Sequence, residues 1–283
     1  MNYSEMRNCC SSYRNLFLLF VLFFGVLDCC IAQSKTKREK SKIVIATWNI
    51  GYFSNGASIN SYVKPNEYGS KLAAYRLLIY NDLHPDILSI NEYNRVFCGK
   101  DNDTNNCVPS SVLFDRYDNL IIGPREGLSK ALFSNIKLKK QKFKYFKSHK
   151  SIDGDEDIRK RESYYIAAKV SIDGYSVMLA SVHLLFSKKI PNAVQQKQIE
   201  ELITAFSRYK RVILLGDWNT TDYSLLKNAG YHLANDGSLI TFPSRKTPLD
   251  NIAVKGVEIS DVKVVSTSLS DHYPIACCIS LKE

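Results

Sequence analysis

Acidic, amide and imidazole side chains follow apolar stretches at many points of this chain. Between residues 211 and 220, a short apolar run ends at Gly216 and is followed by Asp217 and Asn219. The run has no helical period, so it predicts a buried strand. In an extended chain the two polar side chains point the same way. An Asx turn that closes the strand would also explain this stretch, but the same pattern recurs elsewhere.

Other strand ends and their adjoining loops carry the same kinds of side chain. They are Asn49, Glu92, His183, Asp250, Asp271 and His272. Carboxylates and amides, without a nucleophilic serine or cysteine elbow, suit a hard cation with oxygen ligands. Mg²⁺ fits best, because it takes one or two carboxylates and keeps waters that a phosphate can replace; Mn²⁺ and Ca²⁺ are alternatives. Histidines off the metal can serve as acid and base, so the set predicts phosphoester hydrolysis.

Strands alternating with helices are expected to position these groups. Apolar runs predict strands at 42–50, 86–92, 131–134, 164–170, 175–183 and 212–215, with further apolar segments at 249–254, 261–265 and 270–280. Helical spacing predicts helices over 69–83 and 192–207. No internal repeat or linker divides this body. The pattern predicts a strand-rich α/β domain, with two sheets packed face to face and covered by helices.

The N-terminus predicts a secretory signal peptide over residues 1–32. Arg7 and Arg14 precede an apolar stretch at 16–27, which is shorter than the roughly 20 residues that a spanning helix needs. Cleavage after Ala32 would leave a charged, disordered lead-in at 33–41 and a domain at 42–283. We expect a secreted or periplasmic protein, with an uncleaved membrane anchor as the alternative.

The balance of charge favours anionic partners. The 283 residues carry a formal net charge of +10, which suits nucleic acid, acidic lipid headgroups or polyphosphates. Residues 137–150 mix lysines with aromatic side chains. This run predicts either a strand with one solvated basic face or a contact for a phosphate backbone or an anionic lipid surface. Cys98 and Cys107 flank a polar loop and could close it as a disulfide in an oxidising compartment.

Short motifs in chain order resemble those of the endonuclease/exonuclease/phosphatase superfamily. They are Thr47-Trp48-Asn49, Pro85-Asp86 with Asn91-Glu92, Ser181-Val182-His183, Gly216-Asp217-Trp218-Asn219, Leu249-Asp250 and Ser270-Asp271-His272. The resemblance covers residues 42–280. It implies a four-layered α/β sandwich, with two packed mixed β-sheets flanked by helices and an active site at one edge. It also implies metal-dependent hydrolysis of a phosphodiester or phosphomonoester.

The same resemblance implies which residues hold the metal and activate water. Glu92 would be the principal metal ligand, with Asn49 and Asp271 close to the ion. His272 would act as general base on the attacking water, oriented by Asp250 through its second ring nitrogen.

On the phosphate side, the resemblance implies four further roles. Asp217 would orient the nucleophile or protonate the leaving group, and Asn219 would hold a phosphate oxygen. His183 would contact phosphate or act as the acid, as in the branch resembling deoxyribonuclease I and sphingomyelinase. Arg161 is a looser match to a phosphate-contacting arginine. His84, His149 and His232 lie outside the motifs, and we expect them at the surface.

The substrate class stays open at this level. A secreted Mg²⁺-dependent nuclease resembling deoxyribonuclease I is the first expectation, because of the net charge and the basic-aromatic run. A sphingomyelinase-type phospholipase or a phosphoinositide phosphatase of the same superfamily is the alternative. A non-catalytic binding protein on this fold is the third hypothesis. We expect a monomer without a protein partner.

Overall fold

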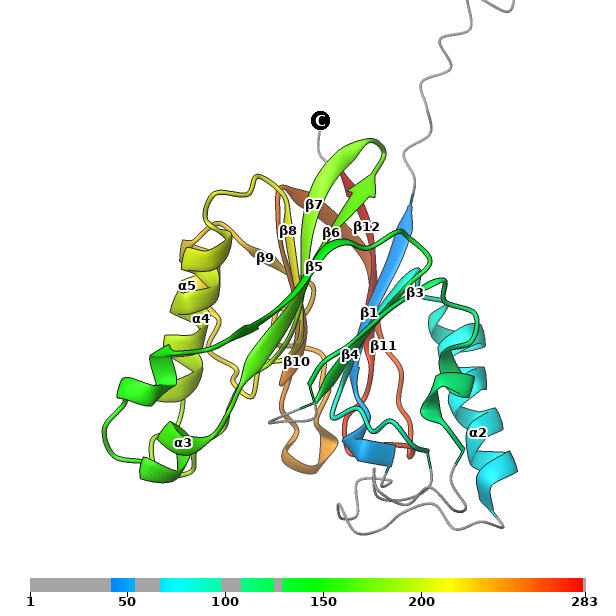
Figure 1. The fold of residues 1–283 in the computed structure, drawn as a ribbon, viewed down its shortest axis with the longest axis horizontal. Helices are drawn as coiled ribbons and strands as arrows, with labels where there is room; N and C mark the ends of the chain where they lie inside the picture. Colours follow the sequence, from blue (N-terminus) through cyan, green and yellow to red (C-terminus); the bar gives the residue numbers. More distant parts are fainter. Residues whose placement is uncertain (1–41, 54–66, 98–107, 125–128, 282–283) are drawn as a thin grey trace, which may run out of the picture. The chain divides into compact units, whose positions relative to one another are not determined.

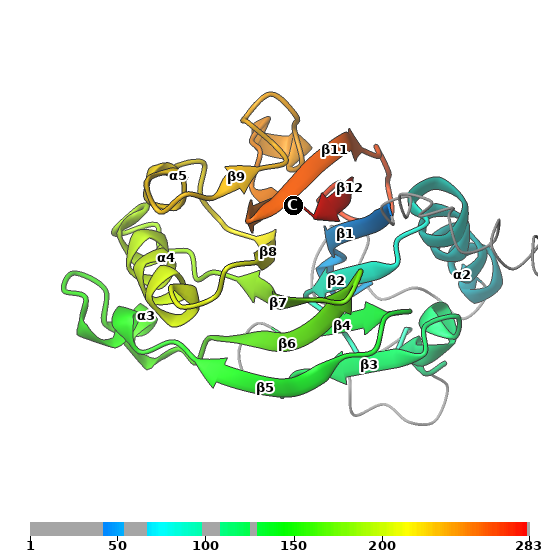
Figure 2. The ribbon, with the colours of Figure 1, turned by 90° about the horizontal axis from the view of Figure 1, so that it is seen from above.

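Two mixed β-sheets face each other, and helices lie on the outer side of each (Figures 1 and 2). The computed structural model describes residues 42–53, 67–97, 108–124 and 129–281. All of them belong to one unit, Ser41–Glu283. The predicted leader, the lead-in, Cys98 and Cys107 lie outside the described residues. Within the described ranges, no helix is long and apolar enough to span a membrane.

The first sheet has six strands in the order β11-β12-β1-β2-β4-β3. Their bounds are β1 (Ile43–Asn49), β2 (Ile87–Asn91), β3 (Asn119–Ile122), β4 (Lys130–Ser134), β11 (Val257–Val264) and β12 (Ile275–Leu281). Strands β1 and β2 are parallel, and the other neighbours are antiparallel.

The second sheet repeats this plan, with the order β5-β6-β7-β8-β10-β9. Its strands are β5 (Lys139–Tyr145), β6 (Tyr164–Ile172), β7 (Tyr175–His183), β8 (Val212–Asp217), β9 (His232–Leu233) and β10 (Asp250–Lys255). Only β7 and β8 run parallel among these pairs. Asp173 and Gly174 join β6 to β7 with positive φ values of 48° and 83°, as the predicted hairpin turn requires.

Helices cover the outer face of each sheet. Helix α2 (Tyr68–Leu77) continues into the π-helical turn η3 (Leu78–Leu83) beside the first sheet, while α4 (Ala193–Phe206) and α5 (Ser224–Asn228) lie beside the second (Figure 1). Both predicted helices are confirmed. Shorter helical segments are η1 (Gly51–Phe53), η4 (Ser110–Phe114), η5 (Ser148–Ser151), α3 (Glu156–Lys160) and η6 (Pro243–Arg245).

Three large apolar clusters of described residues hold these layers together, and a small fourth one lies beside α3. The central one lies between the sheets and includes Ile45, Ile166, Ile213 and Ile252, all fully buried. A second cluster packs α2 and η3 on the first sheet, and a third packs α4 and α5 on the second. The order is therefore helix, sheet, sheet, helix, and the predicted four-layered sandwich is confirmed.

Strand direction gathers the polar strand ends at one edge of the sandwich. In each parallel pair the carboxyl ends are level, which places Asn49 opposite Asn91 and His183 opposite Asp217. Strand β10 runs antiparallel to β8, so its first residue, Asp250, is level with Asp217. Strand β12 is likewise antiparallel to β1, and the loop before it reaches the same edge. Residues far apart in the chain thus meet there.

Candidate active site

Asn49 closes β1 and joins the two sheets at the edge. Its side chain is buried. The Nδ2 group donates to Oδ2 of Asp217, at 3.0 Å, and Oδ1 accepts from the backbone N–H of Gly51, at 3.1 Å. Because both ends of the amide are engaged, its orientation toward Asp217 is set by the surrounding backbone.

Asn91 makes a second bond between the sheets, a role that the sequence did not reveal. Its Oδ1 accepts from the backbone N–H of Asp217 at 2.8 Å, and its Nδ2 donates to the carbonyl of Val182 at 2.9 Å. The residue was visible only as a motif member next to Glu92. The structure places it under the site, where it positions β7 and β8.

Glu92 follows β2 in a strained backbone conformation. Its φ is +52°, a left-handed value that residues other than glycine adopt at a cost and that clusters at functional sites. The side chain is 26% exposed, and Oε1 lies 4.0 Å from Nε2 of His183. Burial raises the pKa of the carboxyl to about 7; a hydrogen bond from Asn49 opposes this, and the charge of Asp217 adds to it.

His183 and Asp217 end the parallel strands of the second sheet. Nε2 of His183 lies 3.4 Å from Oδ2 of Asp217, and both side chains are 2% exposed. Burial lowers the pKa of His183 to about 3, although Asp217 acts in the opposite direction, so the ring is neutral at physiological pH. Burial also raises the pKa of Asp217, and the nearby charge of Asp250 raises it further.

Gly216 permits the close approach of β8 to β7 just before Asp217. Its φ is +153°, and a Cβ at this position would lie 1.8 Å from the carbonyl oxygen of Val182. No side chain fits there, so the glycine is required by the packing of these two strands.

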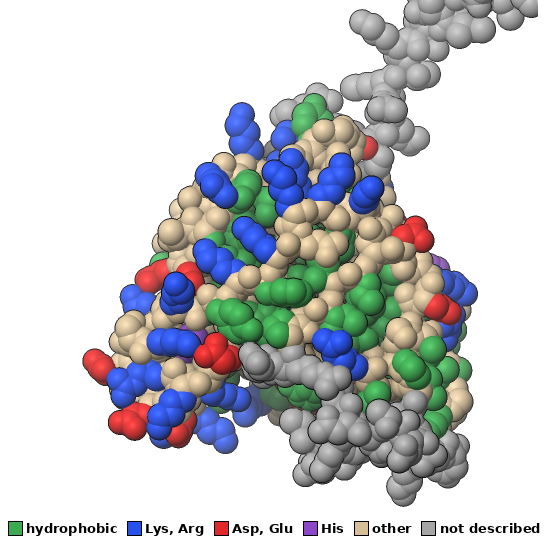
Figure 3. All heavy atoms as spheres, viewed as in Figure 1, with side chains coloured by type: hydrophobic (Ala, Val, Ile, Leu, Met, Phe, Trp, Pro, Cys, Tyr) green, Lys and Arg blue, Asp and Glu red, His purple; other side chains and the backbone are tan. Residues whose placement is uncertain are grey.

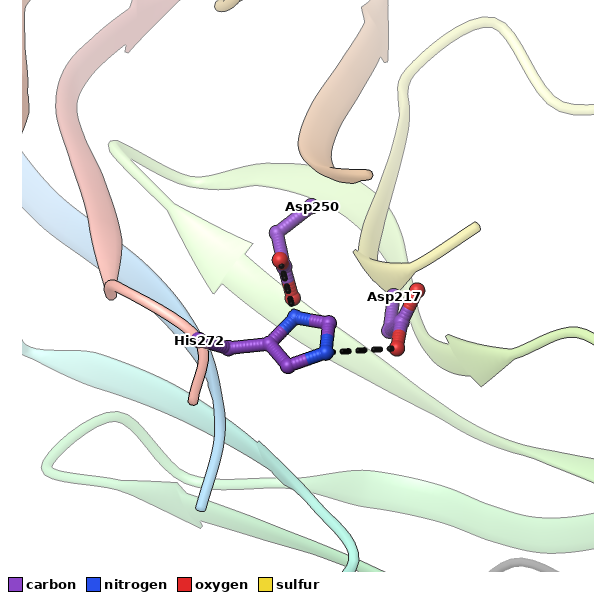
Figure 4. A group of neighbouring side chains, drawn as sticks. All are labelled: Asp217, Asp250 and His272. Carbon is purple, nitrogen blue, oxygen red and sulfur yellow. Dashed lines mark hydrogen bonds and ion pairs between the residues drawn. The ribbon is translucent and has the colours of Figure 1, made fainter. Parts of the chain in front are cut away.

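Asp250 and His272 form a buried pair that faces Asp217 (Figure 4). Nδ1 of His272 lies 2.7 Å from Oδ2 of Asp250, and Nε2 lies 3.9 Å from Oδ2 of Asp217. Burial alone would lower the pKa of His272. The charges of Asp250 and Asp217, with the hydrogen bond to Asp250, outweigh it and raise the pKa to about 10.

The loop before β12 is tied to β1, which fixes His272. The carbonyl of His272 accepts from Nε1 of Trp48 at 3.0 Å, and the hydroxyl of Ser270 donates to the carbonyl of Asn49 at 2.7 Å. Asp271 is half-buried and accepts from the Ser270 hydroxyl at 3.3 Å. Its charge raises the pKa of Glu92, so it lies within electrostatic range of the site.

Asn219 lies at the rim rather than among the buried groups. Its φ is +49°, and its Nδ2 donates to the carbonyl of Leu184 at 2.9 Å. It lines a cavity of about 170 Å³ together with Phe186, Phe242, Arg245, Thr247, Leu249 and His272. The ring of Phe242 packs on His272, with centroids 4.6 Å apart. The aromatic lining was not predicted.

Arg161 is exposed just before β6. Its charge helps to lower the pKa of His183 and opposes the burial that raises the pKa of Tyr52, so the guanidinium acts on the site from its rim. The carbonyl of Arg161 lies 2.9 Å from Nε2 of His149. His149 is fully buried, and its predicted surface position is wrong. His149 belongs to η5 (Ser148–Ser151), which packs against α3 and α4, so tertiary packing rather than the local sequence encloses the ring.

Lys130 is a buried lysine near the site, and no motif in the sequence predicted it there. It is the first residue of β4, is fully buried, and its Nζ lies 4.0 Å from the centroid of the Tyr164 ring. Burial lowers its pKa to about 7. Its charge helps to lower the pKa of His183.

The donor set fits a hard divalent cation. Ligand atoms of Asp217, Asp250 and His272 all lie within 4.8 Å of one another, and Glu92 with Asn49 lies beside them. Oδ1 of Asp250 is buried without a hydrogen-bond partner. Burial raises the pKa values of Glu92 and Asp217, and the charge of His272 offsets this only in part. A cation bound beside these two carboxylates would supply the remaining positive charge.

Comparisons with known structures show this fold at low sequence identity. No family model matches the chain, and no curated protein matches it. An endonuclease/exonuclease/phosphatase from Beutenbergia cavernae has a TM-score of 0.61 at 15% identity, over 86% of this chain and 72% of that one. The human Nocturnin catalytic domain with bound sulfate has a TM-score of 0.59 at 17% identity, over 86% and 96%. D. rerio TDP2 complexed with single-strand DNA product has a TM-score of 0.59 at 17% identity, over 85% and 99%.

Proposed function

We propose that this chain, which has the endonuclease/exonuclease/phosphatase fold, is a metal-dependent phosphoesterase that hydrolyses phosphodiester bonds in nucleic acid. The observation that carries the proposal is the buried arrangement of Asp217, Asp250 and His272 at one edge of the sandwich (Figure 4). A binding protein would gain nothing from an imidazole held by one carboxylate and facing another, since such a pair serves proton transfer.

Glu92 and Asn49, with Asp271 nearby, would hold the metal ion, with Mg²⁺ as the first candidate. Bound there, the ion would neutralise phosphate oxygens and lower the pKa of a water molecule. Glu92 is suited to this because its carboxyl sits at the partly open end of the site, 26% exposed.

His272 would take the proton of the attacking water. Its Nδ1 is engaged by Asp250, which leaves Nε2 as the atom that exchanges protons. With bare carboxylates around it, the pKa of His272 is raised to about 10, which is too high for a base. A cation held near Glu92 and Asp217 would weaken the attraction of Asp217 for the imidazolium, so the neutral ring would become accessible at a lower pH.

Asp217 and His183 would act on the phosphate. Oδ1 of Asp217 accepts from the backbone N–H of Asn219 at 2.9 Å, and Oδ2 accepts from Asn49, so the carboxyl is fixed and can orient the nucleophile or the leaving group. His183 stays neutral, and its Nε2–H tautomer could donate to a phosphate oxygen. Asn219 and Arg161 would contact phosphate from the rim.

The aromatic rim favours nucleic acid over lipid. Cζ of Arg245 lies 5.8 Å from the ring centroid of Phe186 and 5.7 Å from that of Phe242, beside His272. Aromatic rings stack on nucleobases, and arginine pairs with phosphate. Among the described residues, the exposed large apolar side chains are Leu77, Leu120, Phe143, Tyr175 and Ile240. They sit on separate elements, whereas a lipase would need an apolar patch for bilayer entry.

Two further parts of the proposal rest on sequence. The basic start and short apolar stretch of residues 1–32 support export of the protein. The net charge of +10 supports an anionic substrate. We propose a secreted or periplasmic monomer.

Supercoiled plasmid, sphingomyelin vesicles and a soluble phosphoinositide would test the function in parallel. Each is incubated with the purified protein and Mg²⁺, with chelator, and with the His272→Ala variant. We expect plasmid nicking that is lost with chelator and falls about 10²–10⁴-fold in the variant, the range for loss of a general base. The control is His232→Ala, which removes an exposed imidazole on β9 and should nick normally.

Turnover of a lipid or phosphoinositide alone would keep the metal-dependent mechanism and replace the substrate. Equal activity of His272→Ala and the wild type on plasmid would refute the assigned base. Inertness of the wild type on all three substrates would move the binding-only hypothesis ahead.

A further inference from the structure

Strand β5 presents a row of lysines at the free edge of the second sheet. Lys139, Lys142 and Lys144 are exposed, and among the described strands β5 pairs only with β6. Figure 3 shows Lys and Arg side chains along the course that β5 takes in Figure 1. In the part of the chain that the structure describes, none of these three lysines belongs to an ion pair.

The register places these lysines on one face of the strand. Lys142 lies opposite Ala167, and Lys144 lies opposite Tyr165; both partners belong to the cluster under α4. Residues directly opposite in an antiparallel pair point to the same side, so Lys142 and Lys144 face the α4 side of the sheet. Lys139 lies opposite Lys169, which adds another cation to the row.

The end of α4 extends this basic face. The pKa of Tyr209 is lowered, first by a hydrogen bond from Arg208 and then also by the charges of Lys142 and Lys140. Arg208 also stacks on the Tyr209 ring, 5.0 Å from its centroid. Tyr165, which lies opposite Lys144, packs on Phe206, and Phe206 packs on Tyr209, with ring centroids 5.7 Å and 6.1 Å apart. The lysines of β5 therefore lie on the side of the sheet that carries an aromatic ring and a guanidinium, a combination that suits phosphates and bases.

The row begins at the edge that carries the active site. Tyr145, the last residue of β5, lies opposite Tyr164. Ile166 lies opposite Ser181, and two residues further along this ladder Tyr164 is level with His183. From there the seven residues of β5 run away from the site for about 20 Å at the usual rise of a strand. A polymer can span this distance, whereas a single phospholipid headgroup cannot.

We propose that this basic face, Lys139, Lys142, Lys144 and Arg208, binds the phosphate backbone of a polynucleotide whose scissile phosphodiester lies at His272. The inference rests on the proposed function. The basic face would contact the part of the polynucleotide that lies beyond the reacting phosphate. Lysines also protect a free sheet edge from pairing with other chains, and the experiment below separates this protective role from binding.

The test compares two variants that carry the same net charge. The first is Lys139→Gln/Lys142→Gln/Lys144→Gln. The second is Lys42→Gln/Lys227→Gln/Lys263→Gln, which removes three exposed lysines from other parts of the chain. Binding of a labelled single-stranded oligonucleotide is measured by fluorescence anisotropy over a range of salt concentrations, with chelator present to prevent cleavage. Hydrolysis of bis(4-nitrophenyl) phosphate, a diester too small to reach β5, is measured with Mg²⁺.

We expect the β5 variant to bind about 10-fold or more weakly, with the slope of log K against log salt reduced by about 2, since each lost phosphate contact on a single strand contributes about 0.7. The control variant should keep the wild-type slope, and both variants should hydrolyse the small diester normally. An unchanged slope in the β5 variant would overturn the proposal in favour of edge protection. Equal losses in both variants would overturn it in favour of net charge.

Two outcomes separate this proposal from the proposed function. If wild type hydrolyses no diester but the β5 variant alone loses oligonucleotide binding, the assigned chemistry fails and the basic face stands. If wild type binds phosphatidylserine vesicles and no oligonucleotide, the face is a membrane contact and the polynucleotide assignment is wrong.

Discussion

The site edge of the sandwich and the interior between its sheets are made by the same strands from opposite kinds of side chain. In the interior, Ile213 and Leu215 of β8 are fully buried among other apolar residues. The same strand ends two residues after Leu215 at Asp217, which is also buried. The pKa of its carboxyl is raised. Burial therefore stabilises the interior, whereas at the site edge it shifts the pKa values of the polar groups.

The buried polar groups at the site edge lower the free energy of unfolding, and the apolar interior offsets this loss. Burial of a carboxylate or imidazole is unfavourable unless it is compensated, and the shifted pKa values of Glu92 and His183 express that cost. Enzymes commonly hold such strained groups at the expense of stability. Substitutions in the interior should therefore lower stability, whereas substitutions at the site edge should lower activity.

Ile213→Ala should show the largest effect on folding and little on chemistry. The side chain is fully buried between the sheets, and removal leaves a cavity, so the free energy of unfolding should fall by about 2–5 kcal/mol. Denaturant unfolding measures this, and kcat/KM is measured where the variant is fully folded. Leu77→Ala, at a side chain that is 55% exposed, is the control and should change little. A large loss of kcat/KM in folded Ile213→Ala would show that the interior also controls activity.

Glu92→Gln should show the reverse behaviour at the edge. The pKa of Glu92 in the folded protein, about 7, is above its ordinary value of 4.5. Folding therefore favours the protonated carboxyl, and metal-free wild type loses stability as the pH rises from about 4.5 to about 7. Glutamine cannot ionise, so with chelator the variant should be more stable than wild type by roughly 3 kcal/mol at pH 8 and nearly equal at pH 4.

Unfolding at the two pH values, with and without Mg²⁺, measures the Glu92 effect. Mg²⁺ should raise the Tm of wild type and not that of the variant. If the two proteins show the same pH dependence in chelator, Glu92 does not carry the charge strain assigned to it.

Ser89 and Ser181 mark the boundary between the two regions and should give the smallest effect. Their hydroxyls hydrogen-bond across the sheets at 2.6 Å, fully buried. Ser89→Ala leaves the other hydroxyl without its partner and should cost about 1–3 kcal/mol, whereas the double change to alanine should be nearly neutral. A double-mutant cycle by denaturant unfolding measures the coupling. If the stability losses of the two single variants simply add in the double variant, the two hydroxyls are not energetically coupled.

The sequence indicated most elements because their signals are local. Apolar runs predicted β1, β2 and β6 to β8, and helical spacing predicted α2 with η3 and α4. The two-residue strand β9 and the short helices were not predicted, because they contain too few residues to show a periodic pattern of apolar side chains. The basic run 137–150 contains the exposed strand β5, and this exposure fits both of the alternatives that the sequence left open.

The chemical types of the candidate site were also evident in sequence, but their arrangement was not. Glu92, Asp217, Asp250 and His272 stand out as polar groups at strand ends. Asn91 did not stand out as a site residue, because its role depends on bonds to residues more than ninety positions away. The cavity that Phe186 lines together with Phe242 was not predicted, since distant loops bring the two rings together.

The clearest division between sequence and structure concerns the two histidines. Residue identity determined that His183 and His272 could both exchange protons near neutral pH. Tertiary structure decided their charge: both are buried, but His272 is hydrogen-bonded to Asp250 and its pKa is raised to about 10, while that of His183 is lowered to about 3. Identical imidazoles differ because a protonation equilibrium depends on burial and on charges a few ångströms away. Those charges come from strands that meet only when the two sheets pack.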